Sequence, residues 1–357
     1  MTETSADGPS RLIVASCNQT SVHPQPDLTW TSSTDVNDPL LRIKDLSIVA
    51  RGLSKTFTHL KLYRRYVMYM DEWKIGNIRV TRILEMCDPL RTPFEWFPDC
   101  TEEALKPHLH WLVPKSIDPT TGRLIIPIQC YLVRTSHHTI LVDSCVGNNK
   151  TCSYFQHWQN RNDGTFLEKL KTAGVSPEQV DYVLCSHLHF DHCGWNTRLL
   201  NGRWVPTFPN ARYIIALREL EAAKLAAVGK VDGTYEENVL PIIAAGQAVF
   251  VDMDYALDDE VWLEPTPGHT SGHVAIRIRS QGVEAVFCGD IMHWPMQCIY
   301  PDWNAGFDVE QEQARRTRRT FLEASSDNGS IVMTSHFPLP SVGKITRRQS
   351  SFWFNDY

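Results

Sequence analysis

Residues 186–192 read Ser-His-Leu-His-Phe-Asp-His and follow the apolar run VDYVLC (180–185), which is typical of a buried strand. This short loop contains four side chains of the types that bind metal ions: His187, His189, Asp191 and His192. Four ligands in six residues cannot all face one ion, but they can serve two ions a few ångströms apart. Imidazole and carboxylate together suit Zn²⁺ and related ions. So dense a group of ligands has few structural uses, and we interpret the loop as a metal site.

Three later segments have the same form, in which an apolar run ends in a ligand-type residue. They are Thr-Pro-Gly-His269, Phe-Cys-Gly-Asp290 and Thr-Ser-His336. The carboxyl ends of strands are where α/β proteins place their chemistry. Taken alone, each segment is more typical of a turn or a structural histidine, and each gains weight only by completing the set. The sequence therefore predicts a two-metal site of seven residues: His187, His189, Asp191, His192, His269, Asp290 and His336.

Composition excludes several classes of protein. The chain has 357 residues, of which 42% are hydrophobic, so it can bury a large core. Its net charge of −6 argues against nucleic acid as a partner, because phosphate binding needs a basic surface. The ten cysteines show no regular pairing and indicate free thiols in a reducing compartment. With a polar, acidic N-terminus and no run of about 18 apolar residues, we expect a cytoplasmic protein without a membrane span.

The chain divides by composition into three parts. Residues 1–45 are rich in Ser, Thr, Asp and Pro and are expected to form a disordered tail. Residues 46–72 are an N-terminal extension that we interpret as a helix or strand packed on the domain, with a basic membrane-surface helix or a non-native start as alternatives. Residues 73–357 alternate predicted strands and helices, which favours a layered α/β fold. The strands are predicted at 73–86, 124–135, 138–145, 180–187, 211–216, 248–252, 274–278, 284–290, 330–336 and 351–354, and the helices at 164–175, 217–228 and 308–327.

The motif from His187 to His192, followed in order by PGHTSGH at His269, GD at Asp290 and SHFP at His336, resembles the metallo-β-lactamase superfamily. The resemblance extends over roughly residues 75–350. It implies an αββα sandwich, in which two mixed β-sheets pack face to face between flanking helices. On this basis residues 73–357 are expected to form a metallo-β-lactamase-like hydrolase domain.

The resemblance also implies a role for each ligand. His187, His189 and His269 would hold a first metal, and Asp191, His192 and His336 a second. Asp290 would bridge the two, and Asp143 would support the ligands from behind. The implied cofactors are two divalent ions, with zinc expected.

The sequence around these motifs resembles the branch that holds methyl parathion hydrolase and related lactonases and esterases. We therefore expect a hydroxide bound to two metals to cleave a lactone, ester or related acyl bond of a small molecule, with Asp191 and Asp290 as the catalytic carboxylates. The alternatives are phosphotriester hydrolysis or thioester hydrolysis at the same site, a mono-iron redox enzyme, and a non-catalytic metal-binding protein. A homodimer is a further possibility. The aromatic candidates for the substrate pocket, which could equally be core residues, are Phe94, Trp96, Trp195, Trp294, Trp303 and Phe337.

Overall fold

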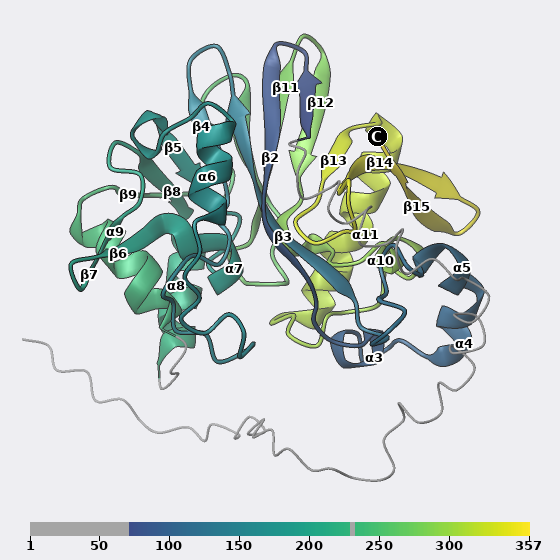
Figure 1. Ribbon diagram of the computed structural model, residues 1–357. Helices are drawn as coiled ribbons and strands as arrows, with labels where there is room; N and C mark the ends of the chain where they lie inside the picture. The colour runs from purple at the N-terminus through teal and green to yellow at the C-terminus, as the bar shows by residue number, and fades with distance from the viewer. Residues whose placement is uncertain (1–70, 229–232) are drawn as a thin grey trace, which may run out of the picture. The chain divides into compact units, whose positions relative to one another are not determined.

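A computed structural model describes residues 71–228 and 233–357 (Figure 1). The predictions for residues 1–45 and, apart from Asp71 and Glu72, for residues 46–72 lie outside the described residues. Within them, strands and helices alternate along the chain as the hydrophobic pattern predicts. The predicted boundary of the domain at residue 73 stays a prediction, and the first described strand begins at Glu72.

Two large mixed sheets organise the described residues. The first has seven strands in the order β1-β2-β3-β4-β5-β8-β9, antiparallel from β1 to β4 and parallel from β4 to β9. The second has six strands in the order β10 to β15, and only β12 and β13 run parallel. The strands of the first sheet are β1 (Glu72–Ile75), β2 (Ile78–Pro89), β3 (Ile125–Arg134), β4 (Thr139–Val142), β5 (Tyr182–Leu184), β8 (Arg212–Ala216) and β9 (Ala248–Val251). Those of the second are β10 (Val261–Pro265), β11 (Val274–Ser280), β12 (Val283–Phe287), β13 (Ile331–Met333), β14 (Val342–Arg348) and β15 (Ser351–Asp356).

Helices and a small hairpin complete the described part of the chain. A separate two-stranded sheet is formed by β6 (Thr197–Leu200) and β7 (Arg203–Pro206). The α-helices are α3 (Pro93–Trp96), α4 (Glu102–Leu105), α5 (Leu109–Leu112), α6 (Thr165–Thr172), α7 (Phe190–Cys193), α8 (Leu217–Ala227), α9 (Leu240–Ala244), α10 (Met296–Ile299) and α11 (Gln311–Asn328). Short 3₁₀ turns lie at Lys106–His108, Pro177–Gln179, Gly194–Asn196 and Gly289–Ile291, and one π-helical turn spans Tyr235–Val239.

Three apolar layers hold these elements together. The middle layer joins side chains of both sheets, for example Val133 and Ile276, so the sheets pack face to face. A second layer places Phe166 of α6 against the outer face of the first sheet. A third places Phe321 of α11 against the outer face of the second sheet, and Figure 1 shows the two helices on opposite flanks. The order helix, sheet, sheet, helix confirms the predicted αββα sandwich.

The structure corrects the predicted strands in a few places. The single strand predicted at 73–86 is wrong, because a turn at Gly76 and Asn77 divides it into β1 and β2. Gly76 has a φ of +57°, and a Cβ there would lie 2.3 Å from the carbonyl oxygen of Ser280, so only glycine fits this turn. Strands β6, β7, β10 and β14 were not predicted, since their alternation is short or interrupted by polar residues.

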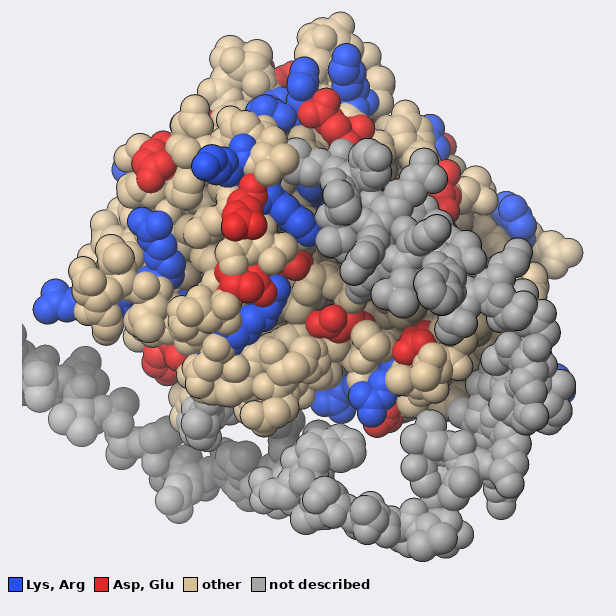
Figure 2. All heavy atoms as spheres, in the orientation of Figure 1, with Lys and Arg blue, Asp and Glu red and all other residues tan. Residues whose placement is uncertain are grey.

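Surface and composition agree with the sequence where the structure describes them. The nine cysteines in the described ranges are all buried. No helix among these residues is both long enough and apolar enough to cross a bilayer. On the face drawn in Figure 2, acidic and basic side chains are intermixed, without a broad basic area.

Candidate metal centre

The seven predicted ligands meet where strands of both sheets end. Strand β5 is followed by His187, β10 by the turn that carries His269, β12 by Asp290 and β13 by His336. Strands β12 and β13 are parallel, and β10 runs in the same direction because β11 is antiparallel to both β10 and β12. Their carboxyl ends therefore lie at one edge of the sandwich, where residues far apart in the sequence come together.

The ligands form two groups, in each of which the candidate ligand atoms lie within 4.8 Å of one another: His187, His189, His269 and Asp290 in the first, and Asp191, His192 and His336 in the second. Asp290 lies between the groups and turns one carboxylate oxygen to each. Its Oδ2 is 3.3 Å from His269 Nε2, and its Oδ1 is 3.2 Å from His192 Nε2 and 3.2 Å from His336 Nε2. The structure brings together the residues of each predicted group, and their role as metal ligands stays a prediction.

Hydrogen bonds behind the ligands determine which nitrogen of each ring faces the centre. The Nδ1–H of His192 donates to Asp143 at 2.9 Å, and that of His269 donates to Asp308 at 2.8 Å. The Nδ1–H of His336 donates to the backbone oxygen of Pro127 at 3.0 Å. Because these nitrogens carry the protons, the Nε2 atoms present lone pairs to the centre when the rings are neutral.

His187 is oriented in the same way through a serine. Its Nδ1–H donates to Ser186 Oγ at 3.1 Å, and the Ser186 hydroxyl in turn donates to Asp143 at 2.9 Å. Asp143 has a φ of +63°, a left-handed conformation that aspartate tolerates better than most side chains. The predicted supporting role of Asp143 thus covers one histidine of each group.

The spacing of these lone pairs fits metal binding. His189 Nδ1 lies 3.0 Å from both His187 Nε2 and His269 Nε2, and His192 Nε2 lies 3.2 Å from His336 Nε2. Two ligands about 2.0–2.1 Å from one zinc ion at tetrahedral angles are roughly 3.3 Å apart. Lone pairs brought this close repel each other unless a cation lies between them. The donor set therefore fits two divalent ions.

The pKa values indicate the charge of each group before a metal binds. Burial and the neighbouring imidazoles hold the pKa of His187 and of His189 well below the usual value, so both rings are neutral and ready to bind. Burial raises the pKa of Asp290, but His192 and His336 outweigh it and keep this carboxylate ionised. Burial also lowers the pKa of His192, yet the surrounding carboxylates raise it well above the usual value. A proton therefore competes with a metal for the second group.

The sequence reasoning missed several residues that shape the centre. Glu219 of α8 accepts from Leu188 N at 2.9 Å and from Thr270 Oγ1 at 2.6 Å, and so it ties the first motif to the loop of His269. His273 accepts from the backbone N–H of Asp290 at 2.9 Å. His293 contacts Asp290 directly, with its Nε2 3.0 Å from Oδ2. Only His273 had a visible signal, because it ends the PGHTSGH segment.

Most of the aromatic pocket candidates are core residues in the structure. The indole N–H of Trp195 donates to Glu85, and that of Trp294 donates to Ser116. Phe337 is fully buried and packs on Phe354, and Trp303 stacks on Tyr300. Of the six candidates, Trp96 alone has a described ring contact with a histidine beside the centre: its ring lies 6.3 Å from that of His293.

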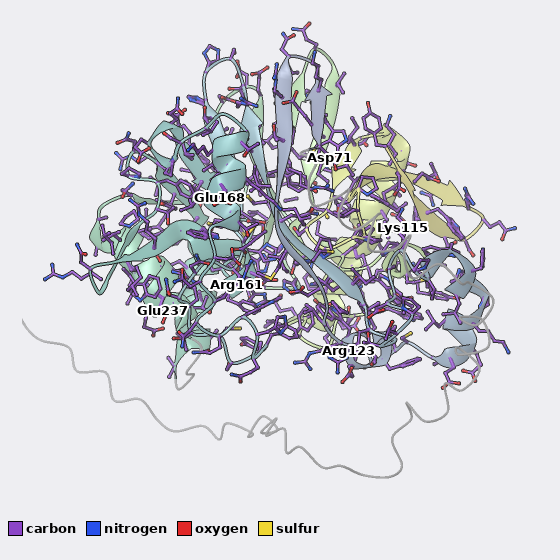
Figure 3. All side chains as sticks on the ribbon, viewed as in Figure 1. Asp71, Lys115, Arg123, Arg161, Glu168 and Glu237 are labelled. Carbon is purple, nitrogen blue, oxygen red and sulfur yellow. The ribbon has the colours of Figure 1, made fainter. Side chains whose placement is uncertain are left out.

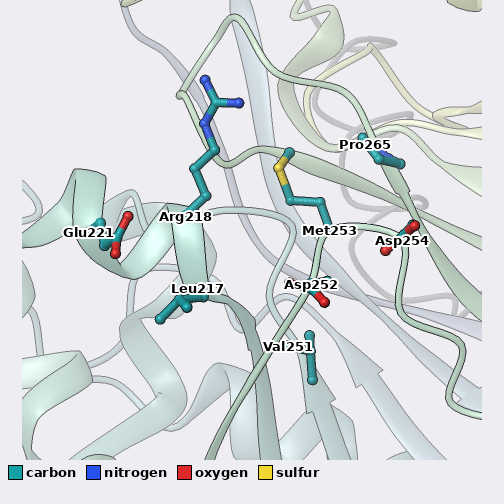
Figure 4. Close-up of a pocket in the computed structure, with 8 residues that line it drawn as sticks. All are labelled: Leu217, Arg218, Glu221, Val251, Asp252, Met253, Asp254 and Pro265. Atoms are coloured by element: carbon teal, nitrogen blue, oxygen red, sulfur yellow. The ribbon is translucent and has the colours of Figure 1, made fainter.

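An open pocket lies beside α8 and the connection from β9 to β10 (Figure 4). Its lining includes Leu217, Arg218 and Met253 but none of the seven predicted ligands. It borders the elements that support the centre, since Glu219 follows Arg218 on α8 and Pro265 ends β10.

Known proteins share this fold and part of this sequence. An N-acyl homoserine lactonase from Bacillus cereus is 31% identical over 178 residues, which are 45% of this chain and 62% of that relative. The matched stretch is thus less than two thirds of the lactonase.

Among solved structures, the hydrolase AbOPH of the beta lactamase superfamily aligns with a TM-score of 0.67 at 23% identity, covering 81% of this chain and 97% of that one. AidC, a dizinc quorum-quenching lactonase in complex with a product, aligns with a TM-score of 0.67 at 21% identity, covering 81% and 97%. At these identities the alignments show a shared fold.

The sequence model of the metallo-beta-lactamase superfamily matches residues 125–336, which span more than half of the chain and run from β3 to the last predicted ligand. The sandwich, the ordered motifs and this match agree, and the chain belongs to the metallo-beta-lactamase superfamily.

Proposed function

We propose that this protein is a hydrolase that uses two divalent metal ions, expected to be zinc, to open a lactone or cleave a related ester bond. His187, His189 and His269 would hold one ion, and Asp191, His192 and His336 the other. Asp290 would bind both ions, because its two oxygens face different groups.

One observation carries the proposal. Each group brings imidazole nitrogens to within 3.0–3.2 Å of one another. In four of these rings, those of His187, His192, His269 and His336, the opposite nitrogen donates to an acceptor behind the ring. A structural cluster of histidines would pair donors with acceptors, since buried polar groups are otherwise costly. Converging lone pairs around a shared carboxylate are what a dinuclear metal site requires.

Two bound ions would supply hydroxide at neutral pH and would polarise the substrate carbonyl. The protein's own residues orient the imidazole ligands. Asp143 and Asp308 hold the imidazoles at fixed angles, so the ligands are in place before substrate binds. Asp191 has 15% of its side chain exposed, against 4% for Asp290, so it is the more accessible of the two carboxylates.

The relatives favour a lactone over the other electrophiles. The matched curated relatives are named N-acyl homoserine lactonases. The superfamily model covers residues 125–336, which contain the ligand motifs. A phosphotriester or a thioester would react by the same chemistry, so substrate preference must be measured.

The test is an elemental analysis of protein purified without added metal, joined to an assay of the same sample on a lactone, a p-nitrophenyl ester, a thioester and a phosphotriester. About two metal ions per chain with chelator-sensitive lactone cleavage would support the proposal. Faster cleavage of the phosphotriester or the thioester than of the lactone would mean that this compound, and not a lactone, represents the substrate class. A single iron without hydrolysis would indicate redox chemistry, and metal without any turnover would indicate a binding protein.

A further inference from the structure

One face of helix α11 packs against the turn that carries His269. Gly268 approaches this face so closely that an added Cβ would lie 2.4 Å from the Cα of Ala314. One helical turn further along, the hydroxyl of Thr317 donates to the backbone oxygen of Pro267 at 2.6 Å. Positions three or four residues apart lie on the same face of a helix. The residues of this face therefore determine where the turn of His269 lies.

Arg318 lies on the same face, four residues after Ala314, and is 1% exposed. All three nitrogens of its guanidinium donate hydrogen bonds. Nε donates to the backbone oxygen of Ile291 at 2.9 Å, and Ile291 directly follows Asp290. Nη2 donates to Asp308 Oδ2 at 3.2 Å. Because the guanidinium is planar and rigid, this one side chain holds the turn of Asp290 and the carboxylate of Asp308 at a fixed separation.

The remaining nitrogen holds the loop that leads to Asp308. Nη1 of Arg318 donates to the backbone oxygens of Pro301 and Trp303, each at 2.8 Å. Ala305 N donates to Asp308 Oδ2 at 3.0 Å and closes the same loop. Buried carbonyl groups require donors, and here an arginine side chain supplies them instead of a strand or a helix. The position of Asp308 therefore depends on Arg318.

Asp308 connects Arg318 to a candidate metal ligand. Its Oδ1 accepts from His269 Nδ1 at 2.8 Å, while its Oδ2 accepts from Arg318. The side chains of this ion pair are 1% exposed for Arg318 and 0% exposed for Asp308, so water does not compete for either. A carboxylate that is held at one oxygen presents the other in a fixed direction, and this direction fixes the plane of the imidazole.

We propose that Arg318 is a positioning residue for the first metal and acts through Asp308 on His269. Its bond to Ile291 keeps His269 in place relative to the turn of the shared carboxylate, Asp290. The inference rests on the metal site of the proposed function and adds to it a residue that is not among the seven candidate ligands. A purely structural arginine would affect only the stability of the fold. A positioning arginine should affect the first metal more than the second.

The experiment replaces Arg318 by lysine, which keeps the positive charge but loses the planar arrangement of donors. Competitive chelator titrations of the metal-free protein with Zn²⁺ measure the affinities of the two metals. We expect Arg318→Lys to bind the first metal about 10- to 100-fold more weakly, with a smaller loss for the second. His189→Ala removes a ligand of the first group alone and identifies which affinity belongs to the first metal. Wild-type affinities for both metals, or equal losses for both, would overturn the inference.

A double-mutant cycle tests whether Arg318 acts through Asp308. Arg318→Lys, Asp308→Asn and the double variant are titrated in the same way. If the two residues act as a unit, the double variant should bind the first metal more tightly than the product of the two single losses predicts. Losses that simply multiply would show that Arg318 does not act through Asp308, and would overturn the inference.

Arg277→Lys is the matched control for burial. Arg277 is 7% exposed and bonds to Glu264 and Glu284 on neighbouring strands of the second sheet. Denaturant titration should show a loss of stability in this variant, whereas both metal affinities should stay at the wild-type values. Arg318→Gln, which keeps a planar donor and removes the charge, serves as the second variant if Arg318→Lys does not fold. It should also weaken the first metal more than the second.

The titrations separate this inference from the proposed function, because they do not require turnover. If the wild-type protein binds two metals but cleaves no lactone or ester, the proposed function fails, and the ratio of the two affinities still decides on Arg318. If lactone cleavage is found and the Arg318 variants bind both metals as the wild type does, only the inference fails. A protein that binds no metal would overturn both.

Discussion

Two clusters of buried polar side chains, around Glu85 and around Asp290, differ in how their polar atoms are paired. Around Glu85 every partner is a donor: its fully buried carboxylate accepts from Val146 N at 2.9 Å and Trp195 Nε1 at 2.7 Å. It also pairs at 3.3 Å with Arg161, which is labelled in Figure 3. Around Asp290, the Nε2 atoms of His192 and His336 lie 3.2 Å from Oδ1, yet this oxygen has no hydrogen-bond partner. Burial is common to both clusters, so the unpaired oxygen, and not burial, distinguishes the candidate metal site from a structural network.

The largest expected effect comes from removing the shared ligand. Asp290→Asn keeps the shape of the side chain but removes the charge that both groups share, so we expect kcat/KM on a lactone to fall roughly a thousandfold or more. Metal content should fall with it. Asp302→Asn, at an exposed carboxylate paired with Arg319, is the control and should retain both. Full activity in the Asp290 variant would contradict the shared-ligand role.

Loss of the Glu85 carboxylate should lower the stability of the fold without changing the metal content. Glu85→Leu leaves two buried N–H groups without their acceptor and Arg161 with Asp163 as its remaining carboxylate, so we expect the free energy of unfolding to fall by about 3–5 kcal/mol. Denaturant titration measures this loss, and elemental analysis should still find the wild-type metal content. Glu85→Gln, which keeps an acceptor, should lose less. A Glu85→Leu variant that sheds metal while keeping its stability would show that the two clusters are not separate.

Variants of the carboxylates that accept hydrogen bonds from the ligand histidines should affect the two metals differently. Asp308→Asn weakens the orientation of His269, and we expect the affinity of the first metal to fall about 10- to 100-fold. Asp143→Asn should weaken both metals, because Asp143 supports His192 directly and His187 through Ser186. Competitive chelator titrations that resolve two metals measure these changes. Equal losses for both metals in the Asp308 variant would argue against two separate groups.

The smallest effect concerns a buried amine outside the metal centre. Burial lowers the pKa of Lys150 to about 7, and its Nζ lies 3.6 Å from the centre of the Trp204 ring. Between about pH 7 and the higher pKa of the unfolded chain, the unfolded state binds more protons, so stability should rise with pH in this window. The Tm of the wild type relative to Lys150→Met should therefore increase by about 2 °C or more from pH 7 to pH 9.5.

The control for this prediction is Lys115→Met, which replaces an exposed amine paired with Asp356. Its Tm difference from the wild type should show no such rise. A flat profile for Lys150→Met would mean that Lys150 keeps its proton in the folded protein.

Local sequence patterns were sufficient to predict the candidate ligands. They were insufficient to predict most of the residues that hold these ligands in place. His187 to His192 form one dense loop, and His269, Asp290 and His336 each end an apolar run, so a chain read in order reveals all seven. Asp308, Glu219 and His293 act on those ligands from a loop, a helix and a turn that carry no motif. The same limit applies to Trp96, which the composition could not separate from core aromatics such as Trp195 and Trp294.

By itself the sequence determined the layered α/β fold class and predicted the seven candidate ligands, because hydrophobic periodicity and ligand spacing are properties of neighbouring residues. Only the tertiary structure decided which nitrogen of each ring faces the centre, since the acceptors that hold the opposite nitrogens come from other segments, such as Pro127 for His336 and Asp308 for His269. It also decided that the rings of Trp96 and His293 lie 6.3 Å apart beside the centre. Such pairings depend on packing between distant segments, which no local pattern records.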